Sequence, residues 1–346
     1  MSEVDETRAA RSYWIEVILL AVAASVSYLV LPLFGPLLCL VPLQALLVRR
    51  GITAFGYAAA LFGIAAVSFR LLTGWGDLPE QIADGLMRAE ILVLILTVGG
   101  LYVLASARFS QYRVLYRLLG ATVAAGVATM PLMAGFLETA SLAAESFLMN
   151  WANSASTSLG DELAADAIAA ARSMADTFRE AAPGILRSYL LIYFVFLTSQ
   201  WWIGTAVGAR SARMPSPLRP VTEFHAPDHL VWVLVGGLAV VAIDQTGALG
   251  NAGLDLLAAI GWNAVLVMAF VFGIQGIAIM RVFAGRYGQS GTTTSLLIGV
   301  MLIIGLFALP WLLLIISAFG ASEIWVHYRQ RLQAGGSDSE DDTDRP

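Results

Sequence analysis

Long apolar segments recur along almost the whole chain, separated by short polar stretches. An α-helix rises about 1.5 Å per residue, so about 20 apolar residues cross the roughly 30 Å hydrocarbon layer of a bilayer. Nine segments meet or approach this length: 14–33, 35–48, 52–72, 86–107, 115–138, 185–208, 229–247, 255–281 and 293–318. Only 13% of the residues are charged, about half the share in soluble domains. The pattern predicts an all-α polytopic membrane protein with about nine transmembrane helices.

The first two apolar segments contain residues that interrupt helices, namely Pro32, Gly35, Pro36 and Pro42. Irregular backbone within a bilayer is tolerated only where protein or a watery cavity covers it. Residues 35–48 therefore form either a full crossing or a re-entrant hairpin with 14–33. The apolar run from Trp14 continues without a small-residue cleavage site, so we expect a retained span in place of a cleaved signal peptide.

Arginines alternate between successive connections. They follow the second, fourth, sixth and eighth apolar segments, at Arg49, Arg50, Arg108, Arg113, Arg117, Arg210, Arg213, Arg219, Arg281 and Arg286. Residues 73–85 and 139–184 carry mainly acidic charges. Short cytoplasmic loops collect basic residues, so the pattern predicts a multi-pass protein of a bacterial cytoplasmic (inner) membrane with its N-terminus in the cytoplasm. Nine crossings place the C-terminal tail outside, although Arg329 and Arg331 favour the cytoplasm.

The chain divides into a six-span bundle, a three-span region and an acidic tail that we expect to be disordered because it has no apolar residues: 1–208, 209–332 and 333–346. The segment 139–184 is too long for a structureless loop, so we expect helices outside the hydrocarbon. Asp161 is a candidate helix start, and Pro183 is expected to end that helix before the next span. The segment forms either a helix pair on the membrane surface or a lid over an outward-facing pocket.

The sequence lacks the common catalytic signatures, HExxH, the Walker loop, GxSxG and CxxC. One cysteine, Cys39, rules out a disulfide or a cysteine zinc site within one chain. No basic patch interleaved with aromatic residues indicates nucleic-acid binding. We therefore expect a protein without catalytic residues or cofactors that is not an enzyme and has no nucleic-acid partner.

Polar residues within the apolar segments are the candidate site residues. Asn263 and Gln275 lie within 255–281, where each amide forms either an interhelical hydrogen bond or part of a ligand site. Twelve residues separate them, which places them about 120° apart around a helix. Two carboxylates near span ends are further ligand-binding candidates, Glu90 and Asp244.

His225 and His229 are weak candidates for a metal site because they are four residues apart and flank Asp228. Pro227 lies between them and argues against a shared helix face. The alternative is that both histidines anchor the chain at the membrane interface.

The last third of the chain carries a distinctive order of residues. Its parts are the run 224–232, Gly250-Asn251, Asn263, Gln275-Gly276-Ile277-Ala278, Pro310 and the closing stretch from Gly320 to Arg329. This order resembles the YybS-like family of bacterial integral membrane proteins, whose function is unknown. The resemblance implies a membrane location but no active residues.

The first six spans are similar in architecture to the substrate-binding subunits of energy-coupling-factor vitamin transporters. Those subunits hold a small molecule near the outer face and dock on a separate ATPase module, whereas the last three spans here are a departure from that pattern. Our first hypothesis is a small-solute-binding or transport protein without its own ATPase, in contact with the lipid bilayer and a small-molecule ligand. The second is a scaffold for an envelope assembly, with a membrane or cytoplasmic protein partner.

Overall fold

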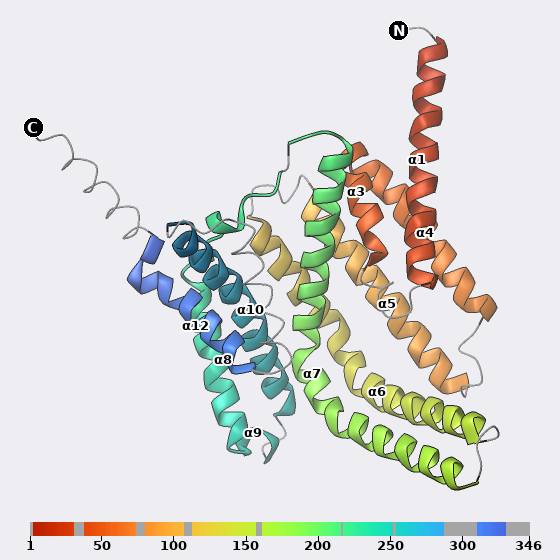
Figure 1. The fold of residues 1–346 in the computed structure, drawn as a ribbon, viewed down its shortest axis with the longest axis vertical. Coiled ribbons are helices and arrows are strands. Elements are labelled where there is room, and N and C mark those ends of the chain that lie inside the picture. The colour runs from red at the N-terminus through yellow and green to blue at the C-terminus, as the bar shows by residue number, and fades with distance from the viewer. Residues whose placement is uncertain are drawn as a thin grey trace, which may run out of the picture. The chain divides into compact units, whose positions relative to one another are not determined.

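The computed structural model describes residues 3–30, 38–73, 80–106, 113–156, 161–215, 217–251, 254–286 and 310–329. All regular secondary structure in these ranges is helical, and they contain no strand. The chain forms two compact units, Met1–Leu218 and Arg219–Pro346 (Figure 1). The boundary lies ten residues beyond the expected division at 208, within the same polar connection.

Among the described residues, five helices are long and apolar enough to cross a membrane: Ala10–Leu29, Ile52–Thr73, Ala83–Ala105, Arg187–Ser211 and Asp255–Ala284. Shorter apolar helices cover Val114–Thr129, Leu230–Gln245 and Leu314–Val326. The predicted all-helical membrane architecture is confirmed, whereas the number nine is not. Most of the predicted span 293–318, together with the predicted tail 333–346, lies outside the described residues.

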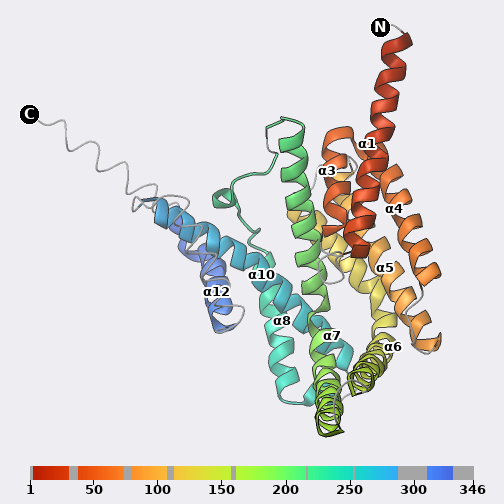
Figure 2. The same ribbon diagram turned by 45° about the vertical axis from the view of Figure 1, so that its right-hand side comes forward.

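The first unit contains α1 (Glu3–Val30), α3 (Leu40–Arg50), α4 (Ile52–Thr73), α5 (Glu80–Ala105), α6 (Val114–Ser156) and α7 (Asp161–Ser211). Its core surrounds α3, which packs against α1, α4 and α7 (Figure 2). With 11 residues, α3 is about 16 Å long and covers half of the hydrocarbon thickness. Its last residues, Arg49 and Arg50, both form ion pairs with Glu16 of α1. Residues 31–37 lie outside the described residues, so the choice between a full crossing and a re-entrant hairpin for 35–48 stays open.

The two longest helices, α6 and α7, form an antiparallel hairpin. They have 43 and 51 residues, or about 64 and 76 Å, more than twice the hydrocarbon thickness. Figures 1 and 2 show both helices continuing beyond the ends of α4 and α5. In this projecting part the helices meet through Ala152, Ala171 and Ala175, which are buried. The described parts of the segment, 139–156 and 161–184, are thus helical and continue the two apolar helices.

The course of α7 tests the prediction about Pro183. The described helix, Asp161–Ser211, runs through Pro183 without a break. The prediction that Pro183 ends a helix is therefore wrong. A proline inside a helix costs about 3 kcal/mol, and the packing of α7 against α6 on both sides of this position outweighs that cost.

The second unit contains η2 (Val221–Glu223), α8 (Leu230–Gln245), α9 (Ala248–Asn251), α10 (Asp255–Arg286) and α12 (Pro310–Val326). The central helix α10 packs against both α8 and α12. Close approach to α8 occurs where Gly237 faces Val265 and Gly261 faces Val240, so these helices are antiparallel.

In contrast, α12 runs parallel to α10. Ser317 donates a hydrogen bond to the Ala269 carbonyl at 2.6 Å, and Tyr328, eleven residues later, contacts the ring of Phe283. The contacts thus advance in the same direction along both helices.

The parallel packing places the end of α12 beside the start of α8. Arg329 donates to the carbonyls of Thr222 and Phe224, so it lies at the end of the unit where α8 begins. That end continues from Arg219, part of the basic connection predicted to be cytoplasmic. The predicted tail 333–346 and most of the predicted span 293–318 lie outside the described residues, so the side on which the tail emerges stays a prediction.

Candidate functional site

Two glycines bring α7 unusually close to α3. A Cβ atom at Gly204 would collide with the side chain of Gln44, and one at Gly208 would lie 2.8 Å from Val48 Cβ and 2.9 Å from the Ala45 carbonyl oxygen. Small residues four positions apart permit this kind of contact between membrane helices. The spacing of Gly204 and Gly208 therefore places α7 directly against the half-helix α3.

Three buried polar side chains lie at this contact, and we call Gln44, Gln200 and Thr205 the α3–α7 polar cluster. Their exposed fractions are 3%, 0% and 4%. The Gln200 Oε1 atom accepts a hydrogen bond from the Leu40 backbone N–H at 3.1 Å. The Gln44 Nε2 group donates to Thr205 Oγ1 at 3.0 Å. Gln44 Oε1 is buried and has no hydrogen-bond partner among the described residues, a situation that typically costs about 1–3 kcal/mol.

The cluster lies deep in the predicted membrane region. Leu40 precedes Arg50 by ten residues and Gln200 precedes Arg210 by ten, which corresponds to about 15 Å along each helix. If the arginines mark the interface, α3 begins near the middle of the hydrocarbon. The first N–H groups of a helix have no partner within it, and Gln200 satisfies one of these groups. The chain thus supplies both a helix start and an orphan acceptor at this depth.

An open depression of about 450 Å³ lies on the first unit, lined by Arg11, Ser12, Ile15, Glu16, Leu19 and Arg49. Glu16 forms ion pairs with Arg49 and Arg50, each at 2.8 Å. No residue of 139–184 lines this depression. The lid interpretation of that segment therefore gains no support from it.

In the second unit, Gln275 joins three parts of the chain. Its side chain is fully buried. Its Oε1 atom accepts from the Ala226 N–H at 2.6 Å, and its Nε2 group donates to the Gly320 carbonyl at 2.9 Å. This geometry matches the structural alternative, in which the amide connects α10 to its neighbours.

The other polar candidates of this unit lie elsewhere along the helices. Asn263 donates to the Ala259 carbonyl of its own helix at 2.9 Å. The Trp262 indole N–H donates to Asp244 Oδ2 at 2.9 Å, which connects α10 to the end of α8. Asn263 and Gln275 occupy separate positions along α10 and use different partners.

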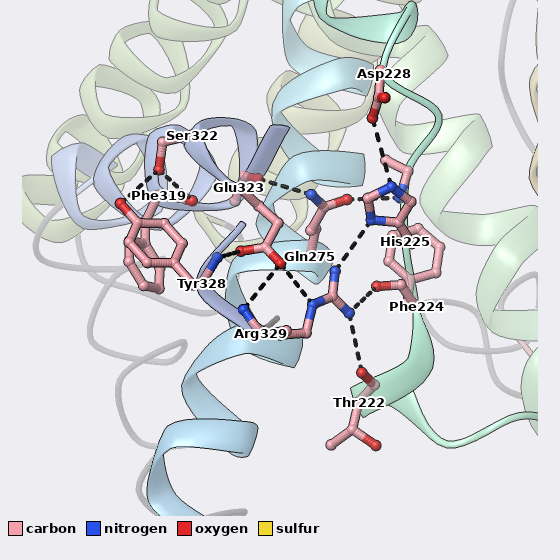
Figure 3. Close-up of polar contacts among 12 residues, drawn as sticks. Thr222, Phe224, His225, Asp228, Gln275, Phe319, Ser322, Glu323, Tyr328 and Arg329 are labelled. Atoms are coloured by element: carbon pink, nitrogen blue, oxygen red, sulfur yellow. Dashed lines mark hydrogen bonds and ion pairs between the residues drawn. The ribbon is translucent and has the colours of Figure 1, made fainter. Parts of the chain in front are cut away.

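A network around Arg329 closes the end of the second unit (Figure 3). The Arg329 Nε group lies 3.0 Å from Glu323 Oε1, and 15% and 6% of the two side chains are exposed. Arg329 also donates to the carbonyls of Thr222 and Phe224, at 3.1 and 2.9 Å. Glu323 accepts from the Tyr328 N–H at 2.9 Å. Each partner of this ion pair thus has further hydrogen bonds that compensate for its burial.

His225 belongs to the same network. Its Nδ1 atom lies 3.3 Å from an Arg329 terminal nitrogen, and its Nε2 atom lies 3.5 Å from Asp228 Oδ1. A guanidinium can only donate, so Nδ1 acts as the acceptor and the ring proton lies on Nε2. Both nitrogens of His225 are therefore engaged with protein groups. Within the described ranges, no group of three or more histidine, cysteine, aspartate or glutamate side chains is placed to hold a metal ion.

Comparison with known proteins agrees with this membrane architecture. Residues 17–321 match the family model described as "Predicted membrane protein (DUF2232)". The chain belongs to this family. No curated protein and no solved structure matches the sequence. DUF2232 membership therefore identifies a membrane protein and leaves its activity open.

The sequence-predicted candidates of this DUF2232 protein are divided between the two units. Glu90 belongs to the first unit, where it lines a small niche of about 10 Å³ with Tyr28 and Ala66. His225 and Gln275 both lie near Ala226 in the second unit. The α3–α7 polar cluster was not among the candidates, although two signals point to it. Gln44 and Gln200 each interrupt an apolar segment, and Gly204 and Gly208 have the spacing of a close helix contact.

Proposed function

We propose that this protein binds or transports a small solute in a bacterial inner membrane, without an ATPase of its own. The observation that carries the proposal is the α3–α7 polar cluster. Polar side chains at membrane depth are costly and commonly mark substrate or ion pathways. Helices that begin within the bilayer are typical of transporter binding sites. The half-helix α3 and its contact with Gln200 combine both features.

The unsatisfied Gln44 Oε1 atom indicates the chemistry of the ligand. An amide oxygen accepts hydrogen bonds and binds cations, and in a low-dielectric environment it strongly favours having a partner. A solute that presents an N–H or O–H group to Gln44 would remove the cost of the orphan acceptor. The proposed ligand is therefore a small molecule with a hydrogen-bond donor that reaches the Gln44 Oε1 atom of the α3–α7 polar cluster.

The proposed function also draws on the two family resemblances of the sequence. Residues 1–208 would act as the binding unit, by similarity to the substrate-binding subunits of energy-coupling-factor transporters, and a separate membrane or cytoplasmic partner would supply energy. The YybS-like resemblance is compatible with this role. The N-terminus and the end of α12 would both face the cytoplasm, because the arginine-rich connections do so in the proposed orientation.

A ligand screen on the full-length purified protein tests the proposal. Vitamins, nucleosides, metal ions and lipids are added separately, and thermal unfolding is recorded. A ligand at about one hundred times its dissociation constant adds about 2.7 kcal/mol of stability. Gln44→Leu and Thr205→Val are expected to abolish the shift caused by the ligand.

Thr122→Val is the matched control. Thr122 is also buried in the first unit, at 3% exposure, but its hydroxyl bonds to the Leu118 carbonyl of its own helix. The control is expected to retain the ligand-dependent shift. If no compound class stabilises the folded protein, or if the control loses the shift together with Thr205→Val, the proposed solute site is wrong.

The projecting hairpin favours a second candidate function, as a scaffold in an envelope assembly. Large apolar side chains lie exposed on its surface: Leu142, Phe147, Trp151 and Met174. Exposed aromatic side chains are enriched at protein interfaces. A Phe147→Ser, Trp151→Ser double variant would then lose a cross-linked partner in native membranes while its thermal stability stays unchanged. Retention of every cross-link in the variant would exclude this role for the hairpin.

A further inference from the structure

The depression between α1 and α3 has two chemically different parts. Its polar part is lined by Arg11, Ser12, Glu16 and Arg49. Its apolar part contains Ile15 and Leu19, which are 55% and 62% exposed. Arg11, Ile15 and Leu19 are four residues apart in turn, so they lie along one face of α1.

The charges of the depression favour an anion. Glu16 is the only acidic residue among its lining residues, and its carboxylate is already paired with Arg49 and Arg50. Arg11 and Arg49 against Glu16 leave one positive charge in excess among the lining residues, and Arg50 beside Glu16 adds another. Arginine and hydroxyl groups together are well suited to phosphate oxygens, because guanidinium groups can form paired hydrogen bonds with them.

The apolar face continues down α1 from the depression. Ile18, Val22 and Val26 are each at least half exposed, and they belong to the helix segment that is apolar enough to cross a membrane. Arginines lie at the end of the span, and exposed aliphatic side chains continue along it. This order matches a phospholipid, whose phosphate is followed by acyl chains. A soluble phosphate compound would use only the polar part.

We propose that the depression between α1 and α3 binds the phosphate headgroup of an anionic phospholipid, with an acyl chain lying along Ile15 and Leu19. The site is independent of the α3–α7 polar cluster. Basic pockets between membrane helices commonly recognise anionic headgroups. Bound lipid would contact both α1 and α3 at the level of the Glu16 ion pairs.

The experiment measures stabilisation of delipidated full-length protein in neutral detergent. Phosphatidylglycerol, phosphatidylcholine and free glycerol 3-phosphate are titrated separately, and thermal unfolding is recorded. Phosphatidylglycerol is expected to act at the lowest concentration. Arg11→Ala is expected to weaken its apparent affinity about fivefold, the effect of one arginine near a membrane surface, without changing the response to phosphatidylcholine.

The matched control is Arg172→Ala, which removes another exposed arginine of the first unit. It is expected to leave the phosphatidylglycerol response unchanged. Equal stabilisation by the two phospholipids would overturn the proposal, as would an unchanged response in Arg11→Ala. If glycerol 3-phosphate binds as tightly as phosphatidylglycerol, the ligand is a soluble phosphate and the lipid assignment is wrong.

Discussion

Replacement of Arg329 by alanine should destabilise the second unit strongly. The substitution leaves the Glu323 carboxylate, whose side chain is 6% exposed, without its charged partner. It also removes the donor to the carbonyls of Thr222 and Phe224. Removal of one partner of a buried ion pair costs about 3–5 kcal/mol. We therefore expect Arg329→Ala to lower the free energy of unfolding by about this amount.

A double-mutant cycle separates the ion pair from its surroundings. The variants are Arg329→Leu, Glu323→Leu and the combination of both. Each single variant leaves one charge buried, whereas the double variant leaves neither, so the double variant should be more stable than the sum of the two single effects predicts. Arg329→Lys should retain part of the stability, because it keeps the charge but loses the planar fork that reaches two carbonyls.

The assay is reversible unfolding by dodecyl sulfate in mixed micelles, followed by circular dichroism. Arg172→Ala is the control, since its side chain is on the exposed surface of the other unit and surface changes usually alter stability by less than about 0.5 kcal/mol. A cost below about 1 kcal/mol for Arg329→Ala, or simple additivity in the cycle, would refute the interpretation of Arg329 and Glu323 as a buried, coupled pair.

Three further predictions concern helix contacts, each measured by the same unfolding assay. Gly204→Ala should cost about 1–3 kcal/mol, because its Cβ would collide with a side chain of α3; Gly56→Ala should cost nothing, since no atom lies within 4 Å of its added Cβ. Gly320→Ala should cost at least as much as Gly204→Ala, because the backbone of α10 blocks its Cβ; a stable variant would contradict the parallel packing. Glu145→Gln should cost less than about 1 kcal/mol, since its ion pair with Arg179 is exposed; a larger loss would show that this pair holds the projecting hairpin together.

Helices bounded by sharp changes in composition could be predicted closely from the sequence. The expected segment 52–72 corresponds to α4, Ile52–Thr73, and 255–281 lies within α10, Asp255–Arg286. In both cases an apolar run begins directly after a helix-breaking or charged residue.

Contacts between distant residues could not be predicted in the same way. Gln44 and Thr205 are 161 residues apart, and nothing in either local sequence indicates the other as its partner. Arg329 was recognised as a charge that favours the cytoplasm, but its contact with Thr222 depends on the parallel direction of α12. Pro183 was interpreted from its local effect alone, which the packing of two long helices overrides.

The distance along the chain between α3 and Gln200 affects the order of events during synthesis. The Leu40 N–H and the Gln200 side chain are 160 residues apart, so at 5–20 residues per second the ribosome needs roughly 8–32 s to make the second after the first. Throughout this interval the start of α3 lacks its partner. A nascent chain arrested before Gln200 should therefore leave Cys39, which is buried in the complete protein, open to a membrane-permeant thiol reagent. The contact between α3 and Gln200, at the centre of the first unit, can therefore form only after α7 has entered the membrane.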